Sequence, residues 1–350
     1  MNASCMVRGS VHQHIPVAGS AKGMARRAIL RVGFLAAVLC TGSLPALAQS
    51  AAVIEGKDAW LFPGWESLDK VDTVGITKSV DLIAFANKEL EKKKIGLVVA
   101  VAPMKAPFHQ DKLSEGTVLS KDFLGRYEMI QKAIAGAGVQ TADLAAAMQK
   151  LPADQGAFFR ADYHWTGWAA EISAQAVASV IKAKWTLKGK AGDGVKLGEW
   201  VKERRFGDLA ANFMTPEQRK EVGREIFTVR RDTDAASAGG GLLDDRLAPV
   251  QVIGNSFVQP YLGFPQALSN ALDRRVAVTW NPGDTGPWAT LLQYLESDDF
   301  KSRPAQVIVW QFNEGQMQQA PDAEGKWVPK AVIANDVWQQ RLTASLAKLP

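Results

Sequence analysis

Short apolar runs of strand length alternate along most of this chain with longer segments of helical periodicity. The apolar runs lie at 95–102, 139–142, 249–254, 275–280 and 306–312. The helical segments lie at 77–94, 120–136, 166–184, 262–272 and 288–297. Strands that alternate with helices pair in parallel, because each helix carries the chain back across the sheet. The pattern predicts an α/β fold, a doubly wound parallel sheet with helices on both faces.

One segment does not fit this alternation. Residues 186–248 include a stretch of small residues and glycines at 235–241, so we predict an insertion beside the functional edge of the sheet. The rest of 49–350 is predicted to form a single domain, with a helix at 334–347 after the last strand. Ligands of such sheets bind at the carboxyl ends of the strands, so the loops after the strands are the place to look for chemistry.

The first 48 residues have the layout of a secretory signal peptide. Arg26, Arg27 and Arg31 form a basic region, the apolar run 32–40 follows, and Ala46-Leu47-Ala48 is a cleavage site with small residues. We expect cleavage and export, with Met24 as an alternative start of translation. The other interpretation is an uncleaved anchor, but the apolar run is short for a membrane span.

The leader also accounts for the basic composition. Of the 41 basic residues, five lie in 1–48, where there is no acidic residue, so the remainder carries 36 basic and 36 acidic residues. The charge therefore gives no reason to expect nucleic-acid binding. Both cysteines, Cys5 and Cys40, fall in the leader, and only two histidines follow it. With no glycine-rich phosphate loop and no metal-ligand spacing, we expect neither a cofactor nor a metal.

Two short motifs carry the residues of nucleophilic catalysis. Asp162 stands two residues before His164, just ahead of a predicted helix, where a carboxylate can fix the histidine tautomer and stabilise the imidazolium. Ser256 follows the apolar run that ends in Gly254, at the edge of the sheet where a nucleophile is exposed. Together they form a predicted nucleophile, base and orienting group. The alternatives are an ordinary surface turn around His164 and a helix N-cap at Ser256.

At these residues the chain resembles a known family, the alginate O-acetyltransferases AlgX and AlgJ, which have an SGNH-hydrolase-like fold. The similar motifs are Gly-Lys-Asp-Ala-Trp-Leu-Phe at 56–62, Pro-Met-Lys at 103–105, Asp-Tyr-His-Trp at 162–165, Gly-Asn-Ser-Phe at 254–257 and Val-Trp-Gln-Phe-Asn-Glu at 309–314. The family usually has threonine where this chain has Tyr163, and arginine where it has Gly315. The chain ends at Pro350, so we expect no counterpart of the C-terminal carbohydrate-binding module of AlgX.

The resemblance implies a periplasmic enzyme that transfers acetyl through a serine ester onto an exopolysaccharide, alginate-like or cellulose-like. Ser256 would be the nucleophile, His164 the base and Asp162 its orienting group. A membrane O-acyltransferase would be the partner that supplies acetyl. We expect substrate contacts from Lys105, Trp165, Tyr261 and Asn255, the last as an oxyanion donor. The alternatives are a carbohydrate esterase with the same three residues and a non-catalytic polysaccharide-binding or scaffold subunit of an export complex.

Overall fold

The computed structural model describes residues 52–233 and 248–349 of the chain. The predicted leader, including the alternative start at Met24, and the whole glycine-rich stretch 235–241 of the predicted insertion lie outside these residues. Among the described residues, no helix combines the length and the apolar character that a bilayer span requires.

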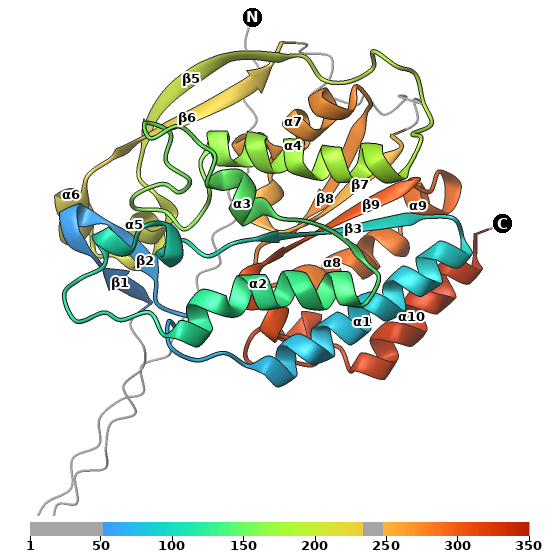
Figure 1. Cartoon of the computed structure of the whole chain (residues 1–350), viewed down its shortest axis with the longest axis horizontal. Helices are drawn as coiled ribbons and strands as arrows, with labels where there is room; N and C mark the ends of the chain where they lie inside the picture. The colour runs from blue at the N-terminus through green and yellow to red at the C-terminus, as the bar shows by residue number, and fades with distance from the viewer. Residues whose placement is uncertain (1–51, 234–247, 350) are drawn as a thin grey trace, which may run out of the picture. The chain divides into compact units, whose positions relative to one another are not determined.

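The centre of the fold is one five-stranded sheet with the order β4-β3-β9-β7-β8 (Figure 1). Every neighbouring pair in this sheet is parallel. The strands are β3 (Gly96–Ala102), β4 (Gln140–Ala142), β7 (Val250–Gly254), β8 (Val276–Trp280) and β9 (Val307–Asn313). The predicted parallel α/β sheet is confirmed, and each strand lies where an apolar run predicts it.

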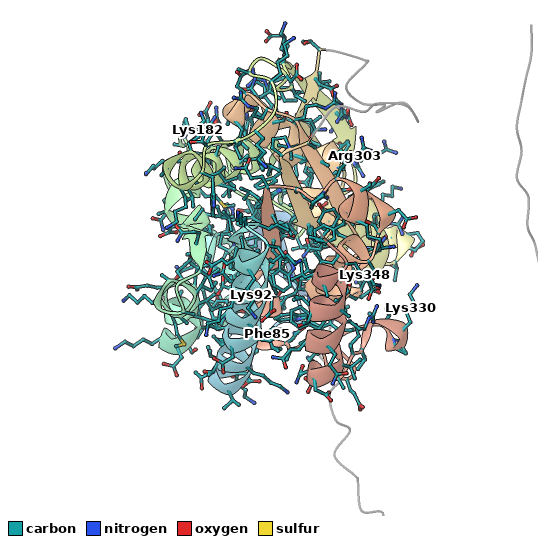
Figure 2. All side chains as sticks on the ribbon, turned by 90° about the vertical axis from the view of Figure 1, so that its right-hand side faces the viewer. Phe85, Lys92, Lys182, Arg303, Lys330 and Lys348 are labelled. Carbon is teal, nitrogen blue, oxygen red and sulfur yellow. The ribbon has the colours of Figure 1, made fainter. Side chains whose placement is uncertain are left out.

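Helices cover both faces of this sheet, as Figure 1 shows. One face carries α1 (Thr73–Lys92), α2 (Lys121–Gly136), α8 (Gly286–Leu295), α9 (Asp298–Ser302) and α10 (Asn335–Ala347). The other face carries α3 (Leu144–Met148), α4 (Gly167–Lys184) and α7 (Phe264–Leu272). Figure 2 shows α1 and α10 side by side, with the exposed Lys92 and Lys348 near their ends.

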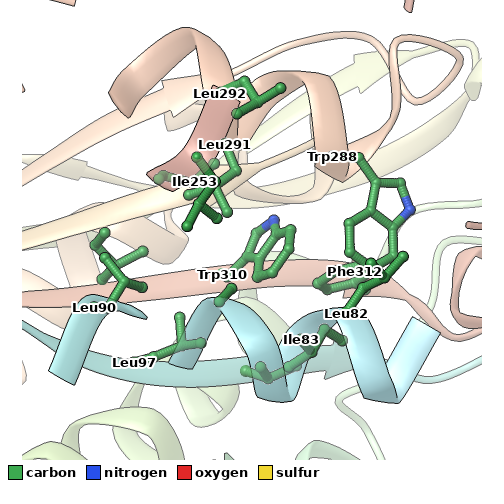
Figure 3. Close-up of a cluster of buried hydrophobic side chains, with 14 of the residues drawn as sticks. Leu82, Ile83, Leu90, Leu97, Ile253, Trp288, Leu291, Leu292, Trp310 and Phe312 are labelled. Carbon is green, nitrogen blue, oxygen red and sulfur yellow. The ribbon is translucent and has the colours of Figure 1, made fainter. Parts of the chain in front are cut away.

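Alternate residues of each strand enter two separate cores, because successive side chains of a strand point to opposite faces. In β3, Leu97 and Val99 pack in the first core, and Val98 and Ala100 pack in the second. Figure 3 shows the first core, where Leu97, Ile253 and Trp310 project from three strands toward α1 and α8. Each large apolar side chain buried in this way contributes about 1.5–3 kcal/mol.

Two small antiparallel ribbons lie outside the central sheet. One pairs β1 (Val53–Glu55) with β2 (Leu61–Pro63), and the other pairs β5 (Leu197–Arg205) with β6 (Glu225–Asp232). Between β5 and β6 the chain forms α5 (Asp208–Phe213) and α6 (Pro216–Val222). The described part of 186–248 therefore adds no strand to the parallel sheet. Short 3-10 turns complete the chain: η1 (Lys57–Ala59), η2 (Ala106–Phe108), η3 (Gln110–Lys112), η4 (Ser256–Val258), η5 (Pro260–Leu262), η6 (Glu314–Gln318) and η7 (Pro329–Ala331).

Candidate active site

Three neighbouring strands of the sheet end at one edge and bring three motifs together. β3, β9 and β7 are adjacent and parallel, and they end at Ala102, Asn313 and Gly254. Ser256 lies just beyond β7 as the first residue of η4, and it is half-buried. Gly254 is required in this turn, because a Cβ atom there would lie 2.5 Å from Gln311 Oε1 and 2.9 Å from Val258 Cγ2. The close packing presents Ser256 at the edge of the sheet.

The loop before α4 carries the other two residues to the same place. His164 Nε2 lies 2.8 Å from Ser256 Oγ, and His164 Nδ1 lies 2.7 Å from Asp162 Oδ1. Thr166 caps α4 by accepting a hydrogen bond from the Ala169 backbone N–H, which fixes the helix start at Gly167, three residues after His164. The structure thus brings the predicted residues Asp162, His164 and Ser256 together, although Ser256 lies about ninety residues from the other two in the sequence.

The carboxylate of Asp162 is fully buried behind the histidine and accepts three hydrogen bonds. They come from the His164 Nδ1–H, the His164 backbone N–H at 2.8 Å and the Asp208 backbone N–H at 2.9 Å. Burial by itself would raise the pKa of the Asp162 carboxyl, but the positive charge of His164 and these hydrogen bonds outweigh it and lower the pKa. An ionised Asp162 can hold the ring and stabilise its protonated form.

Asp208 completes a group of three possible metal ligands. Asp162, His164 and Asp208 each place one ligand atom within 4.8 Å of the others. Both ring nitrogens of His164 are already hydrogen-bonded, to Asp162 and to Ser256, so no ring lone pair is free for an ion. Burial, followed by the charge of Asp162, raises the pKa of Asp208. The geometry is that of a hydrogen-bonded general base.

Comparison with known proteins identifies the family of this chain. Residues 53–314 match the family described as "SGNH hydrolase-like domain, acetyltransferase AlgX". The chain belongs to this family. The predicted resemblance is thereby confirmed, and it covers the central sheet, both ribbons and all three residues of the hydrogen-bonded set.

Several relatives of this chain are named as probable alginate O-acetylases AlgJ. The chain is 30% identical over 294 residues to AlgJ of Pseudomonas fluorescens, covering 79% of this chain and 72% of that protein. It is 29% identical over 296 residues to AlgJ of Pseudomonas syringae pv. tomato, covering 81% and 74%. The solved O-acetyltransferase domain of Pseudomonas putida AlgJ is 26% identical with a TM-score of 0.67, covering 84% of this chain and 99% of that domain. Pseudomonas aeruginosa AlgX, at 18% identity and a TM-score of 0.59, covers 77% of this chain and 67% of its own and shows a shared fold.

Lys105, the lysine of the family's Pro-x-Lys motif, is not a substrate contact. Its side chain is only 2% exposed, and Nζ donates to the carbonyl oxygens of Leu61 at 2.6 Å, Arg160 at 2.7 Å and Asp162 at 2.8 Å. These three bonds use all the donors of the ammonium group. Burial lowers the pKa of Lys105 to about 7. Lys105, just after the end of β3, thus connects the opening motif at Leu61 with the loop that carries Arg160 and Asp162.

Asn255 is also fully used within the protein, so the expectation of an oxyanion donor there is wrong. Its side-chain NH₂ donates to Asn313 Oδ1 and to Gln316 Oε1, both at 2.9 Å. Its side-chain oxygen accepts from the Phe257 backbone N–H, and its own backbone N–H donates to Gln311. Asn255 holds the Ser256 turn to the end of β9.

Trp165 is a core residue instead of a substrate contact. It is completely buried, stacks on Phe264 and donates its indole N–H to the carbonyl oxygen of Phe257 at 3.0 Å. Tyr261, by contrast, is half-buried, and its hydroxyl donates to Glu203 at 2.9 Å. The guanidinium of Arg205 lies over its ring, 4.5 Å from the centroid. Of the four expected substrate contacts, Tyr261 is the one whose surroundings permit that role.

Gly315 stands where the family usually has arginine, and it lies against the side chain of Glu66. A Cβ atom at Gly315 would lie 2.8–2.9 Å from the carboxyl group of Glu66. Glu66 and Glu314 also line a cavity of about 20 Å³, which is room for one water molecule. Burial raises the pKa of Glu66 to about 7, against the attraction of Arg126. The loop that carries Glu66 thus fills the space beside η6, and the sequence offered no signal of this contact.

Sequence reasoning missed the position of Tyr163. Its ring packs on the His164 ring at a centroid distance of 4.0 Å, and its hydroxyl lies 3.1 Å from Ser256 Oγ. The one available signal was the replacement of the family's threonine between Asp162 and His164 by a longer side chain with a hydroxyl at its end.

Proposed function

We propose that this chain is an O-acetyltransferase that moves an acetyl group through an ester on Ser256 onto hydroxyl groups of an alginate-like exopolysaccharide. The observation that carries the proposal is the hydrogen-bonded series Ser256–His164–Asp162 at the carboxyl edge of the sheet. The AlgJ relatives, which are named as probable alginate O-acetylases, support the reaction and the polymer.

The first half of the reaction acetylates the serine. Ser256 Oγ attacks the acetyl carbonyl carbon while its proton passes to His164 Nε2. The imidazolium is stabilised by Asp162, which accepts the Nδ1–H. The tetrahedral oxyanion needs donors, and the backbone N–H of Ser256 is suitably placed, because the first N–H of a 3-10 turn has no acceptor inside the turn. The oxyanion collapses, the donor's leaving oxygen takes the proton from His164, and the acetyl ester remains on Ser256.

The second half transfers the acetyl group to the sugar. A sugar hydroxyl gives its proton to His164 Nε2 and its oxygen attacks the ester carbon. The bond to Ser256 Oγ then breaks, and Oγ recovers a proton from His164. Water in place of the sugar would give an esterase, so the outcome depends on how well the acceptor is held.

Two surface features near Ser256 suit an acidic sugar chain. Trp65 is 43% exposed and Phe213 is 47% exposed, their ring centroids are 5.3 Å apart, and Trp65 also packs edge-on against Tyr163. Exposed aromatic rings of this kind can stack on a pyranose. Arg205 is exposed over Tyr261, and its guanidinium can pair with the carboxylate of a uronate.

The same proposal places the enzyme in the periplasm, with a membrane O-acyltransferase as the source of acetyl. The support is the signal-peptide pattern of 1–48 and the family to which the chain belongs. Cytoplasmic acetyl carriers do not reach an exported protein, so a donor on the outer side of the membrane is required.

Mass spectrometry of the purified protein tests the proposal. The protein is incubated with p-nitrophenyl acetate, with and without an oligomannuronate acceptor. We expect one acetyl adduct on Ser256 that transfers to the oligosaccharide, and no adduct on a Ser256→Ala variant. An adduct that is lost only to water would favour the esterase. A folded protein with no adduct would contradict the proposal and favour a binding or scaffold subunit.

A further inference from the structure

We propose that Tyr163 is a catalytic residue, which donates a hydrogen bond to the Ser256 oxygen and stabilises the negative charge that develops there in both halves of the reaction. This inference rests on the proposed function. It follows from the contact between the Tyr163 hydroxyl and Ser256 Oγ at 3.1 Å, at the same oxygen that His164 Nε2 approaches to 2.8 Å.

The direction of the hydrogen bonds follows from the partners. Asp162 has only acceptor oxygens, so His164 Nδ1 carries a proton and donates it to Oδ1. The neutral ring then has an acceptor at Nε2, which takes the single proton of Ser256 Oγ. The hydroxyl of Tyr163 must therefore donate to a lone pair of Oγ. The result is one directed series from Tyr163 through Ser256 and His164 to Asp162.

The side chain of Tyr163 is held in place and kept protonated. Its ring packs on His164, on the edge of Trp65 and against Phe257. Burial raises the pKa of Tyr163 to about 12, so the phenol stays a donor at neutral pH. With its rotation restricted, the hydroxyl needs little reorganisation when the charge forms, which is the condition for electrostatic stabilisation of a transition state.

The effect is catalytic because the charge on Oγ changes during the reaction. Oγ gains negative charge as its proton passes to His164, and the hydrogen bond from Tyr163 becomes charge-assisted and stronger. In the acetyl ester Oγ is a weak acceptor, and the bond weakens. When the sugar attacks, Oγ leaves as a developing alkoxide and the bond strengthens again before the proton returns from His164. The interaction is therefore stronger in both transition states than in the states between them.

Tyr163→Phe tests this role, because it removes the hydroxyl and keeps the ring contacts. The experiment follows the release of p-nitrophenol from p-nitrophenyl acetate before the steady state, and then the loss of acetyl from the protein. We expect both rate constants to fall about 10- to 100-fold, with an unchanged burst amplitude per folded protein. If Tyr163 had only a structural role, Tyr163→Phe would lower the burst amplitude or the melting temperature. The molecules that remain folded would then react with unchanged rate constants.

Tyr294→Phe is the matched control. The Tyr294 hydroxyl accepts a bond from the Ala305 backbone N–H in the other core, and both rate constants should match those of the unchanged protein. Equal rate constants for Tyr163→Phe and the unchanged protein would overturn the inference and leave the proposed function standing. An unchanged protein that forms no acetyl adduct would instead contradict the proposed function itself.

Discussion

Replacement of Asp162 by asparagine tests the orienting role that the hydrogen-bond geometry assigns to this carboxylate. Oδ1 accepts two hydrogen bonds from His164, and Oδ2 accepts one from the Asp208 backbone N–H. An asparagine with its oxygen toward His164 keeps both of those bonds and turns its NH₂ against the Asp208 N–H. The reverse orientation places NH₂ against two N–H groups of His164. The first orientation costs less, so the histidine tautomer should be preserved.

The variant then loses mainly the negative charge that faces the imidazolium. A hydrogen bond to a charged group contributes about 1.5–3 kcal/mol, and a neutral one about 1 kcal/mol. With two bonds to His164 weakened, we expect the transition state to lose about 2–3 kcal/mol, which lowers the acylation rate constant roughly 30- to 150-fold. A fall near 10⁴-fold would indicate the reverse orientation and a wrong tautomer.

The assay is the burst of p-nitrophenol from p-nitrophenyl acetate, with Asp208→Asn as the matched control. Asp208 Oδ2 lies 3.6 Å from His164 Nδ1, beyond hydrogen-bond distance, and its backbone N–H bond to Asp162 survives the substitution. We expect the control to change the rate constant less than about threefold. An unchanged rate in Asp162→Asn, or a larger loss in Asp208→Asn, would refute the assignment.

Three further predictions address the turn, the Glu66 pocket and the acceptor. Gly254→Ala should destabilise the fold by about 1–3 kcal/mol, because the new Cβ displaces Gln311 from the Ser256 turn. Urea denaturation measures the loss of stability, and the acylation rate constant measures the effect on Ser256. An unchanged urea midpoint would contradict the close packing at Gly254. Because the pKa of Glu66 rises to about 7 in the folded state, folded protein holds an extra proton between about pH 4.5 and 7, and stability falls as pH rises through that window. The difference in unfolding free energy between Glu66→Gln and the original protein should therefore grow in favour of the variant by up to about 3 kcal/mol from pH 5 to pH 8. The same dependence of unfolding free energy on pH in both proteins would contradict this prediction. Arg205→Ala should raise the KM for an oligouronate severalfold and leave the reaction rate with p-nitrophenyl acetate unchanged. The control, Arg204→Ala, removes the same charge from the opposite face of β5 and should leave both unchanged. Equal effects of the two variants would indicate that only net charge matters.

Much of the fold was accessible from local patterns. The apolar run 95–102 and the run 306–312 became β3 and β9, which pair over their whole length from Gly96 with Val307 to Ala102 with Asn313. The prediction worked because strands buried on both faces are apolar at nearly every position, with Gln311 as the buried polar exception inside β9. The cap of α4 is a local feature of the same kind, because the Thr166 side chain accepts its hydrogen bond from the backbone N–H of Ala169, only three residues along the chain.

The chemistry was only partly accessible. Asp162 and His164 are two residues apart, so their pairing is a local event, and Ser256 follows a strand whose end can be read from the sequence. Lys105 and Asn255 were misjudged, because a polar residue after a strand looks the same whether its donors face solvent or a neighbouring segment. Their partners come from Leu61, Asn313 and Gln316, which only the folded chain brings near.

The sequence by itself determined the parallel α/β sheet, the edge at which its strands end and the residue types that meet there, because periodicity and strand termination are local properties of the chain. The tertiary structure decided which of those polar groups remain available for substrate. It directs Lys105 to backbone carbonyls and brings the Tyr163 hydroxyl to Ser256 Oγ. The physical reason is that a buried donor is satisfied by whichever acceptor the fold brings within 3 Å, and that acceptor is distant in sequence.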